Sequence, residues 1–386
     1  MAVYLLAACL AVIGSNAFGL GAIAPAIAKS LGIPGPRVMV SATCYGAGTA
    51  LSALFLSHCI DKCGVFASLR MAMAAFAGSL LFASAASSVT VLCASQFIAG
   101  AAVGIAVPAI YAGALELAPT GNENRTVGVA LGGWTLSLMG GVALSTVLAE
   151  LMNWRAVFVI NAVVCLSVIF ALNRVKDSRG ADESSPPPPP PPLSALRIPG
   201  LHPLLVSCAA SMAAFYGLYS YLGDYISRGL HRSLIVGGLA TCVYGAGFGA
   251  GTFLDRTFDR LDSRESLPIV FLSAAALYLS IAVGGDRLPV LMALILLLGV
   301  VNHAQVNLLV TRLTDTQPES KGAILGLNTA VTYIGSLAGT ALCGPIYSAY
   351  GFRTIAAVSA VLVFAASLSS KDRGHSHERR KNRRPS

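Results

Sequence analysis

Twelve long apolar segments constrain this chain more than any other feature of its sequence. They cover residues 3–28, 38–60, 66–87, 90–115, 126–150, 155–172, 203–226, 233–254, 267–284, 288–311, 322–347 and 352–369. About 20 apolar residues let an α-helix cross the hydrocarbon core of a bilayer, so each segment can span one. Of the 386 residues only 11% are charged, against about 25% in a typical soluble domain. The sequence therefore predicts an all-α membrane protein with twelve transmembrane helices.

The first segment and the cysteines each have an alternative interpretation. A secretory signal would begin with basic residues and contain about 7 to 15 apolar residues, whereas this segment has no basic start and continues to Pro25. We therefore interpret it as a retained helix. The nine cysteines are odd in number and lie mostly inside apolar segments. This placement is typical of small packing residues, not of a disulfide framework.

The distribution of Lys and Arg predicts the orientation of the chain in the membrane. With a cytoplasmic N-terminus, 19 of the 26 basic residues fall on the cytoplasmic side. The positive-inside rule then places both termini in the cytoplasm, and we expect a multi-pass protein of the bacterial inner membrane. The net charge of +9 comes largely from the tail, residues 371–386, which we expect at an anionic lipid leaflet and not on nucleic acid. A solvated, disordered tail is the simpler interpretation of His375 and His377 than a weak metal site.

One long polar stretch, residues 173–200, divides the segments six and six. It contains seven consecutive prolines, 186–192, which favour a stiff polyproline II spacer. A docking site for an SH3-type domain is the alternative, but a linker between two bundles needs no partner. We predict an N-terminal six-helix bundle over 1–172, a cytoplasmic linker over 173–200, a C-terminal six-helix bundle over 201–370 and a basic tail over 371–386.

The two halves also repeat each other in sequence. Three charged positions recur at a nearly constant offset: Asp61 with Asp255 (194 residues), Arg125 with Lys321 (196 residues) and Arg155 with Arg353 (198 residues). Because each half has an even number of helices, the copies lie in parallel orientation about an axis along the membrane normal. This is one of the known plans of transporter folds.

Several motifs together carry a family resemblance. They are SHCIDKCG (57–64) with its second-half counterpart GTFLDRTF (251–258), FIAGAAVG (97–104), ELAPTGNENR (116–125), NWRAVF (153–158) and PESKGAILGLNT (318–329). With these motifs the chain resembles the major facilitator superfamily, and within it the twelve-helix DHA1-type drug and sugar efflux proton antiporters. The resemblance covers the chain apart from the tail and the polyproline insert. It implies two pseudo-symmetric six-helix bundles that move against each other.

The resemblance further implies a conformational gate at the cytoplasmic ends of the helices. In that family the motif acid and its basic neighbour form ion pairs that hold while this mouth is shut. Carried onto this chain, the gate residues are Asp61, Lys62, Gly64, Glu116 and Arg125, with Gly251, Asp255, Arg256, Arg312 and Lys321 in the second half. Ordinary interfacial charges are the alternative. We reject a metal site, because Cys59 and Cys63 with His58 lack a fourth ligand at zinc spacing.

Polar and aromatic residues inside the spans mark the candidate solute site, because polar groups are costly in lipid. In a two-bundle transporter this site lies near the midplane between the halves. The candidates are Asn16, Tyr45, Gln96, Trp134, Phe215, Tyr216, Tyr219, Tyr244, Asn302, His303, Gln305, Asn307, Asn328 and Tyr333. Such a lining suits a small, mostly neutral or amphipathic solute. Each residue has hydrogen bonding between helices as its alternative role.

Proton coupling requires a group that changes its protonation between two states. The first span contains no carboxylate, and Gln96 stands where the resembled family usually has a buried arginine. The remaining candidates are His303, whose unperturbed pKa of about 6.5 lies in a useful range, and Asp224 near the outer end of the seventh span. Contact with water outside the membrane is the alternative for Asp224.

Glycines and a missing proline bear on the packing of the helices. Three small-xxx-small pairs indicate close helix approach: Gly100 with Gly104, Gly247 with Gly251 and Gly335 with Gly339. The family's motif in the fifth span normally has a Gly-Pro pair, but here Gly141, Val142, Ser145 and Thr146 occupy it. Without the proline, the sequence does not predict the kink that it would produce.

We therefore predict a secondary transporter that exports a small organic solute, such as a drug, sugar or nucleoside, by proton antiport. An uptake symporter or an uncoupled facilitator is the alternative within transport. A membrane receptor and a membrane-embedded enzyme are remote alternatives, and the sequence has no HExxH, GxSxG or P-loop motif. We expect no cofactor and no metal. Protons and the solute are the expected partners, and the chain is expected to act as a monomer.

Overall fold

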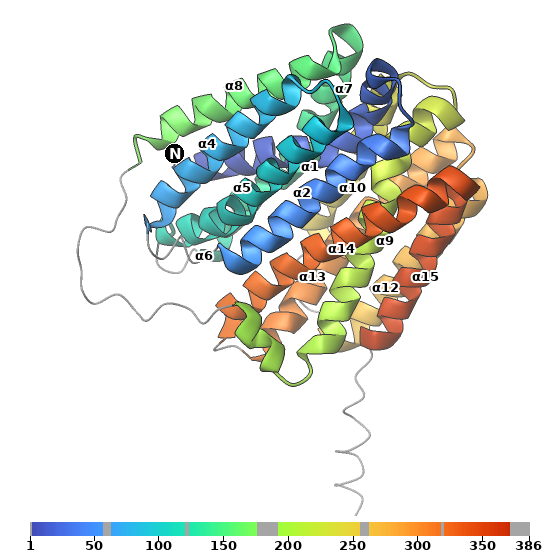
Figure 1. Cartoon of the computed structure of the whole chain (residues 1–386). Helices are drawn as coiled ribbons and strands as arrows, with labels where there is room; N and C mark the ends of the chain where they lie inside the picture. Colours follow the sequence, from blue (N-terminus) through green and yellow to red (C-terminus); the bar gives the residue numbers. More distant parts are fainter. Residues whose placement is uncertain are drawn as a thin grey trace, which may run out of the picture.

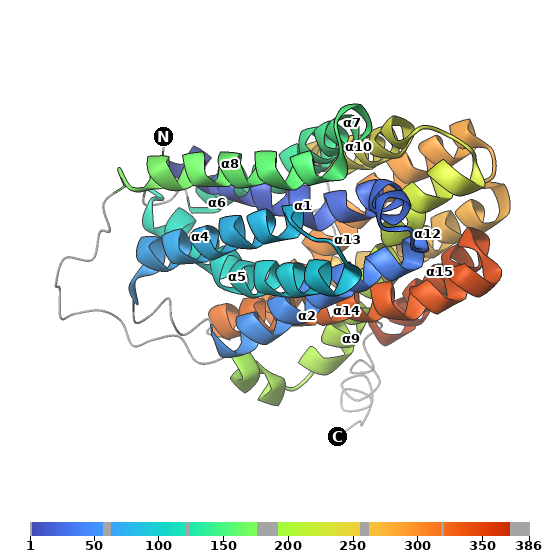
Figure 2. The same ribbon diagram turned by 45° about the horizontal axis from the view of Figure 1, so that its top comes forward.

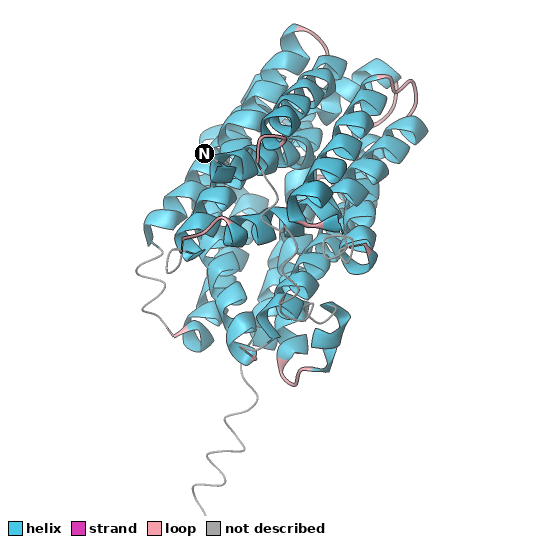
Figure 3. Ribbon diagram, turned by 90° about the vertical axis from the view of Figure 1, so that its left-hand side faces the viewer, coloured by secondary structure: helices cyan, strands magenta, loops and turns pink. Residues whose placement is uncertain are grey.

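The computed structural model describes residues 2–56, 63–119, 123–175, 192–254, 262–317 and 320–370. Twelve helices in these ranges are long and apolar enough to cross a membrane, with lengths from 19 to 30 residues. They coincide with the twelve predicted segments, so the prediction of an all-α membrane protein is confirmed. Figure 3 shows helices and loops and no strand within the described ranges.

The first six spans form the N-terminal bundle. Their helices are α1 (Ala2–Leu31), α2 (Gly35–Phe55), α4 (Val65–Ser84), α5 (Val89–Glu116), α6 (Glu123–Leu136), η1 (Ser137–Gly141), α7 (Val142–Leu151) and α8 (Trp154–Leu172). The helices α6, η1 and α7 are continuous and together make the fifth span. The middle piece, η1, is a short π-helix, so this span has an irregular turn that ends at Gly141, directly before the position of the resembled family's proline.

The last six spans form the C-terminal bundle. Their helices are α9 (Leu201–Asp224), η3 (Tyr225–Gly229), α10 (Leu234–Gly251), η4 (Thr252–Leu254), α12 (Ser263–Gly284), α13 (Leu288–Thr316), α14 (Lys321–Tyr350) and α15 (Phe352–Ser370). The π-helix η3 extends the seventh span beyond Asp224. Between the bundles, η2 (Pro192–Arg197) packs on α14 and buries Ala195. The rest of the predicted linker, 176–191, and the predicted tail lie outside the described residues.

The two bundles pack against each other along matching helices. Helix α2 runs beside α14, α7 and η1 pack on α10, and α1 packs on α9 (Figures 1 and 2). We call the face with residues 32–34, 85–88, 152–153, 230–233, 285–287 and 351 the distal face, because it lies opposite the chain termini. Close contacts between the bundles include Gly21 with Ser220 and Gly238 with Thr146, both in the distal half of the spans.

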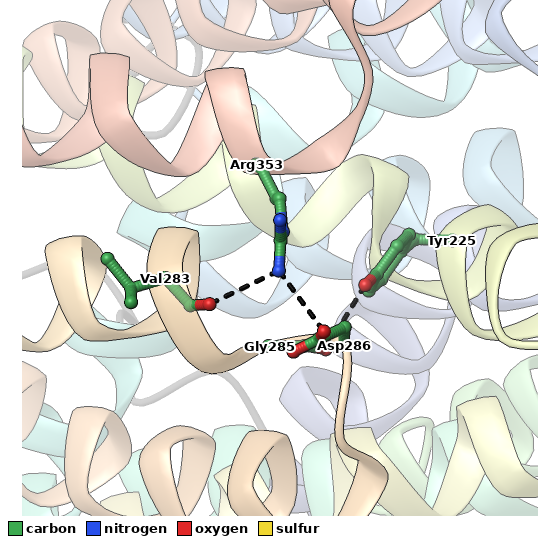
Figure 4. Close-up of polar contacts among 5 residues, drawn as sticks. All are labelled: Tyr225, Val283, Gly285, Asp286 and Arg353. Atoms are coloured by element: carbon green, nitrogen blue, oxygen red, sulfur yellow. Dashed lines mark hydrogen bonds and ion pairs between the residues drawn. The ribbon is translucent and has the colours of Figure 1, made fainter.

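The sequence repeat is also visible in side-chain contacts. Arg155 Nη2 donates to the carbonyl oxygen of Ala86 at 3.0 Å, just after α4 ends. Arg353 Nη2 donates to the carbonyl oxygen of Val283 at 3.2 Å, at the end of α12 (Figure 4). Each arginine thereby satisfies a carbonyl at a helix C-terminus, where cations are favoured. The equivalent arginine makes an equivalent contact in each bundle, which is consistent with a duplicated fold.

The predicted glycine pairs all lie at close helix crossings. A Cβ atom on Gly100 would overlap the carbonyl oxygen of Tyr45. The absence of a side chain at Gly100 therefore lets the backbones of α5 and α2 come into direct contact. Gly247 and Gly339 face carbonyl oxygens of α13 and α9 in the same way. Close approach of this kind supplies the van der Waals packing that holds helices together in lipid. The eight described cysteines are free, in line with a packing role.

Candidate functional site

An aromatic cluster connects the two bundles at the middle of the membrane spans. Phe18 of α1 lies 5.7 Å from the ring of Trp134 in its own bundle. The same ring lies 6.2 Å from Tyr216 and 5.8 Å from Tyr219, both on α9 of the other bundle. Ring pairs at these separations attract each other beyond their burial of area. Phe18 therefore joins the two halves at the point where a central site is expected.

The cluster continues into the C-terminal bundle. The ring of Phe215 lies 5.2 Å from Tyr219 and 5.1 Å from Tyr244, which belongs to α10. Phe248, one turn further along α10, lies 6.3 Å from Tyr244 and 5.0 Å from the imidazole of His303. A continuous row of rings thus extends from Trp134 to His303 through both bundles.

A small cavity lies beside this row. Its volume is about 20 Å³, which is room for about one water molecule. Six predicted residues line it: Asn16, Tyr45, Gln96, Tyr216, Tyr219 and Tyr333. They come from α1, α2, α5, α9 and α14, so both bundles line one cavity. A cavity of this volume is too small for a drug-sized solute in this conformation.

An amide pair forms the polar wall of the cavity in the N-terminal bundle. Asn16 Nδ2 donates to Gln96 Oε1 at 3.0 Å, and Gln96 Nε2 donates to Asn16 Oδ1 at 3.5 Å. Both side chains are buried. Each amide keeps a further donor or acceptor, because an amide group has two donors and an acceptor with two lone pairs. The pair is satisfied within the protein and retains capacity for a ligand.

Two tyrosine hydroxyls next to the site differ in their hydrogen bonding. The hydroxyl of Tyr244 accepts a hydrogen bond from Asn302 Nδ2 at 3.1 Å, and both residues are buried. Tyr45 lines the cavity, and its buried hydroxyl has no hydrogen-bond partner within the described part of the chain. A buried hydroxyl without a partner is costly, which is the situation that a polar ligand would relieve.

The remaining candidates of the tenth and eleventh spans lie away from the cavity lining. His303 packs against Gly251, where a Cβ atom would lie 2.6 Å from His303 Cγ. The predicted gate glycine is thus in contact with the predicted coupling histidine. Gln305 is buried on α13, and Asn307 is half-buried on the same helix. Asn328 is half-buried near the start of α14.

Asp224 is buried at the distal face, with 5% of its surface exposed. Its Oδ2 accepts a hydrogen bond from the hydroxyl of Tyr347 at 2.9 Å. Its Oδ1 forms an ion pair with Arg228 Nε at 3.1 Å. Protein groups therefore hold the carboxylate inside a packed contact. The alternative considered from the sequence, that Asp224 simply contacts water outside the membrane, does not agree with this burial.

The face opposite the distal face, to which the first and last helices bring the chain ends, is called the terminal face, and the structure describes only part of the gate predicted there. Asp61, Lys62, Asp255 and Arg256 lie outside the described residues, and so do the side chains of Arg125 and Lys321. Arg312 is 9% exposed, and its Nη1 donates to the carbonyl oxygen of Ser370 at 2.7 Å. Glu116 is exposed at the end of α5, and Gly64 precedes α4 with a φ of 85°. The Arg312 contact satisfies the C-terminus of α15, a role that sequence reasoning missed.

Sequence reasoning also missed several residues of the central site. Phe18 and Phe248 carry no polar group, and neither was singled out by helical spacing from a tyrosine as Phe215 is from Tyr219. Ser220, Ser336 and Thr340 line the cavity, but small hydroxyl residues are common inside transmembrane helices. One available signal was the spacing of Tyr244 and Phe248, four residues apart on one helix face. Within the described ranges, no group of three or more His, Cys, Asp or Glu side chains forms a metal site.

Twelve spans in two repeated bundles, with a central cavity lined by both, are typical of two-bundle membrane transporters. A family model described as Major Facilitator Superfamily matches residues 5–340, and the chain belongs to this superfamily. It is a multi-pass membrane transporter, and its similar proteins are transporters, not enzymes.

Among known proteins, the "Uncharacterized MFS-type transporter YwfA" of Bacillus subtilis (strain 168) is 24% identical over 90% of this chain and 86% of its own. The "Chloramphenicol resistance protein" of Streptomyces lividans is 25% identical over 87% of this chain and 86% of its own. A solved structure of a bacterial homolog to the human lysosomal transporter Spinster has a TM-score of 0.78 at 15% identity. It covers 96% of this chain and 95% of its own, and shows the same fold.

Proposed function

We propose that this protein exports a small organic solute across the bacterial inner membrane by alternating access, driven by proton antiport. The observation that carries this proposal is the ring contact of Phe18 with Tyr216 and Tyr219 across the two bundles. A rocking motion of one bundle against the other must change this contact. A solute bound between these rings is therefore exposed to one side at a time.

The lining of the cavity supports a mostly neutral or amphipathic solute. Aromatic rings supply apolar surface, and the Asn16–Gln96 pair and the Tyr45 hydroxyl supply hydrogen-bonding groups. Among the described residues the lining holds no carboxylate, lysine or arginine, so nothing in it favours an ion. The name of the Streptomyces lividans relative supports a drug-like solute, with sugars and nucleosides as further candidates of similar polarity.

The proposed orientation follows from charge. The excess of Lys and Arg on the terminal face supports cytoplasmic termini, which places the distal face outside the cell. The close contacts of the bundles in the distal half then correspond to a transporter closed to the outside. On the cytoplasmic face we propose Glu116, Arg125 and their second-half counterparts as the gate that closes in the opposite state.

Proton coupling is proposed to pass through Asp224 or His303. Asp224 supports this role because it is a buried carboxylate at a contact between α9, α14 and α2. His303 supports it because its imidazole touches the aromatic row through Phe248 and therefore senses the central site. We propose a monomer as the working unit, because one chain supplies both walls of the cavity.

An uncoupled facilitator is the second candidate function. The observation that favours it is the lining of the cavity, in which tyrosines are the only titratable side chains among the described residues. A carrier of this kind would move the same solute down its gradient without a proton step.

The experiment is a flux assay in proteoliposomes with an imposed pH gradient. We would measure uptake of radiolabelled chloramphenicol and of a panel of drugs, sugars and nucleosides, with a pH-sensitive dye to follow protons. Solute flux that moves protons in the opposite direction, and that Asp224→Asn or His303→Ala uncouples, is the expected result. Solute flux that ignores the pH gradient would replace antiport with the facilitator. No flux for any solute would overturn transport of these classes.

A further inference from the structure

Two carboxylates cross the boundary between the bundles at the distal face. Glu150, at the end of α7 in the N-terminal bundle, accepts a hydrogen bond at Oε2 from the backbone N–H of Ile235 at 2.9 Å. Ile235 belongs to the first turn of α10 in the C-terminal bundle, and Ser233 before it makes no side-chain cap. The first N–H groups of a helix have no partner within the helix. Glu150 thus satisfies one of them from the other bundle.

Asp224 makes the second crossing in the opposite direction. A Cβ atom on Gly35 would overlap the Asp224 carboxylate and lie 2.9 Å from its Cγ, so the carboxylate lies directly against this glycine. Gly35 is the first residue of α2 in the N-terminal bundle, and Pro34 before it provides no side-chain cap. A helix N-terminus carries about half a positive charge and attracts a carboxylate. Tyr347 and Arg228 hold the carboxylate in this position.

The helix N-termini in the two contacts are related by the internal repeat, whereas the carboxylates come from the fifth and the seventh spans. Gly35 and Ile235 are 200 residues apart, close to the offsets of 194 to 198 residues between the repeated charges. Helices α2 and α10 are the second and eighth spans and hold equivalent places in the two bundles. Each bundle therefore offers the N-terminus of its second helix, and each receives a carboxylate from the other bundle.

We propose that Glu150 and Asp224 form a paired latch that holds the distal face closed. Opening this face separates α7 from α10 and α9 from α2, so both carboxylates must leave a helix N-terminus. The two contacts differ in strength because Glu150 is exposed, whereas Asp224 is 5% exposed. Water therefore screens the charge of Glu150 more strongly than the charge of Asp224. Asp224 is therefore the stronger element of the latch. This inference concerns which side is closed and does not depend on the identity of the solute.

A third acidic residue on the same face provides a matched control. Asp286 Oδ2 pairs with Arg353 Nη2 at 3.2 Å, and both residues belong to the C-terminal bundle (Figure 4). Tyr225 reinforces this corner by donating to the carbonyl oxygen of Gly285 at 3.1 Å. The Asp286 contact moves with its bundle as a unit, because it does not cross the boundary. Removing its charge leaves the latch intact.

The test is a distance measurement on the full chain by double electron–electron resonance. p-Acetylphenylalanine replaces Ser87 in one bundle and Tyr350 in the other, both exposed on the distal face. Spin labels attached to this residue do not react with the native cysteines. We expect one short distance population in the wild type. Asp224→Asn raises the ratio of longer to shorter distances about tenfold, and Glu150→Gln raises it about threefold. Asp286→Asn leaves the distribution unchanged.

Three further results decide the proposal. Gly35→Ala keeps both charges but inserts a methyl group between α2 and Asp224, so we expect it also to increase the population of longer distances. It therefore tests the latch even if a charge variant fails to fold. An unchanged distribution in the Asp224→Asn/Glu150→Gln double variant, with a monodisperse protein, would overturn the latch. An equal shift in Asp286→Asn would overturn it too, because the effect would then come from loss of any distal charge. Flux of the solute is not needed for any of these readouts.

Discussion

The ring of Phe18 on α1 lies 5.8 Å from the ring of Tyr219 on α9, and this edge-to-face contact joins the two bundles at the centre of the protein. Phe18 also contacts Trp134 and Tyr216. One apolar side chain is thus the common neighbour of aromatic residues from two other spans, one in each bundle. Its position makes it the most direct probe of the proposed solute site.

Phe18→Leu is expected to lower the initial rate of solute flux about tenfold. Leucine preserves much of the apolar volume but loses three ring contacts, each of about 0.5–1.5 kcal/mol beyond burial. The measurement is the rate in proteoliposomes at equal protein content. Phe364→Leu is the matched control, because Phe364 is exposed on the outer surface of α15. Equal rates for the two variants would remove Phe18 from the solute path.

Tyr45→Phe is expected to separate binding from stability. Its hydroxyl has no hydrogen-bond partner within the residues described, so its removal relieves a desolvation cost and leaves the Tm unchanged or higher. If the hydroxyl binds the solute, the Kd of a transported compound rises about three- to tenfold. Scanning fluorimetry and equilibrium binding measure the two effects, with the exposed Tyr350→Phe as the control. A lower Tm with unchanged Kd would assign the hydroxyl to the fold alone.

Gly100→Ala and Gly78→Ala are expected to change the thermal stability in opposite directions. A methyl group on Gly100 overlaps the carbonyl oxygen of Tyr45, and overpacking of this kind costs about 1–3 kcal/mol. A methyl group on Gly78 meets no heavy atom within 4 Å, and alanine is a better helix former than glycine by about 1 kcal/mol. The Tm should fall by several degrees for the first variant and stay level or rise for the second. The same sign for both would contradict the close crossing of α2 and α5.

Arg312→Ala is expected to lower the thermal stability of the protein, and a change in solute flux is expected to be the smaller effect. The side chain is 9% exposed and donates to the carbonyl oxygen of Ser370 at the end of α15, so its loss leaves a buried carbonyl without that donor. The cost is about 1–3 kcal/mol, visible as a lower Tm. Arg197→Ala, which removes an exposed arginine of η2, should leave the Tm unchanged. A normal Tm with altered flux would instead favour the gate role that the sequence predicted for Arg312.

Much of the architecture was predictable because the membrane imposes a simple rule on the sequence. A span needs about 20 apolar residues whatever it packs against, so all twelve spans were predicted from composition and length. The repeat was predictable for a similar reason, since Arg155 and Arg353 keep the same local role at the ends of α4 and α12. The close glycine crossings also follow from local spacing on one helix face.

The central site was predictable in part. Asn16 and Gln96 stand out as polar residues in apolar spans, but their 80-residue separation conceals the fact that they hydrogen bond to each other. Phe18 has no local signal at all, because phenylalanine is an ordinary lipid-facing residue. Its role arises only from the rings of α9 that lie beside it.

By itself, the sequence determined the number of spans, the duplication and the membership in a transporter superfamily, because these depend on hydropathy and motifs along the chain. The tertiary structure decided which polar and aromatic residues meet, and that Glu150 and Asp224 each reach a helix of the other bundle. Lipid gives a helix no hydrophobic reason to choose one partner over another. The choice depends on the shapes and hydrogen-bonding groups of surfaces far apart in sequence, which come together only in the folded protein.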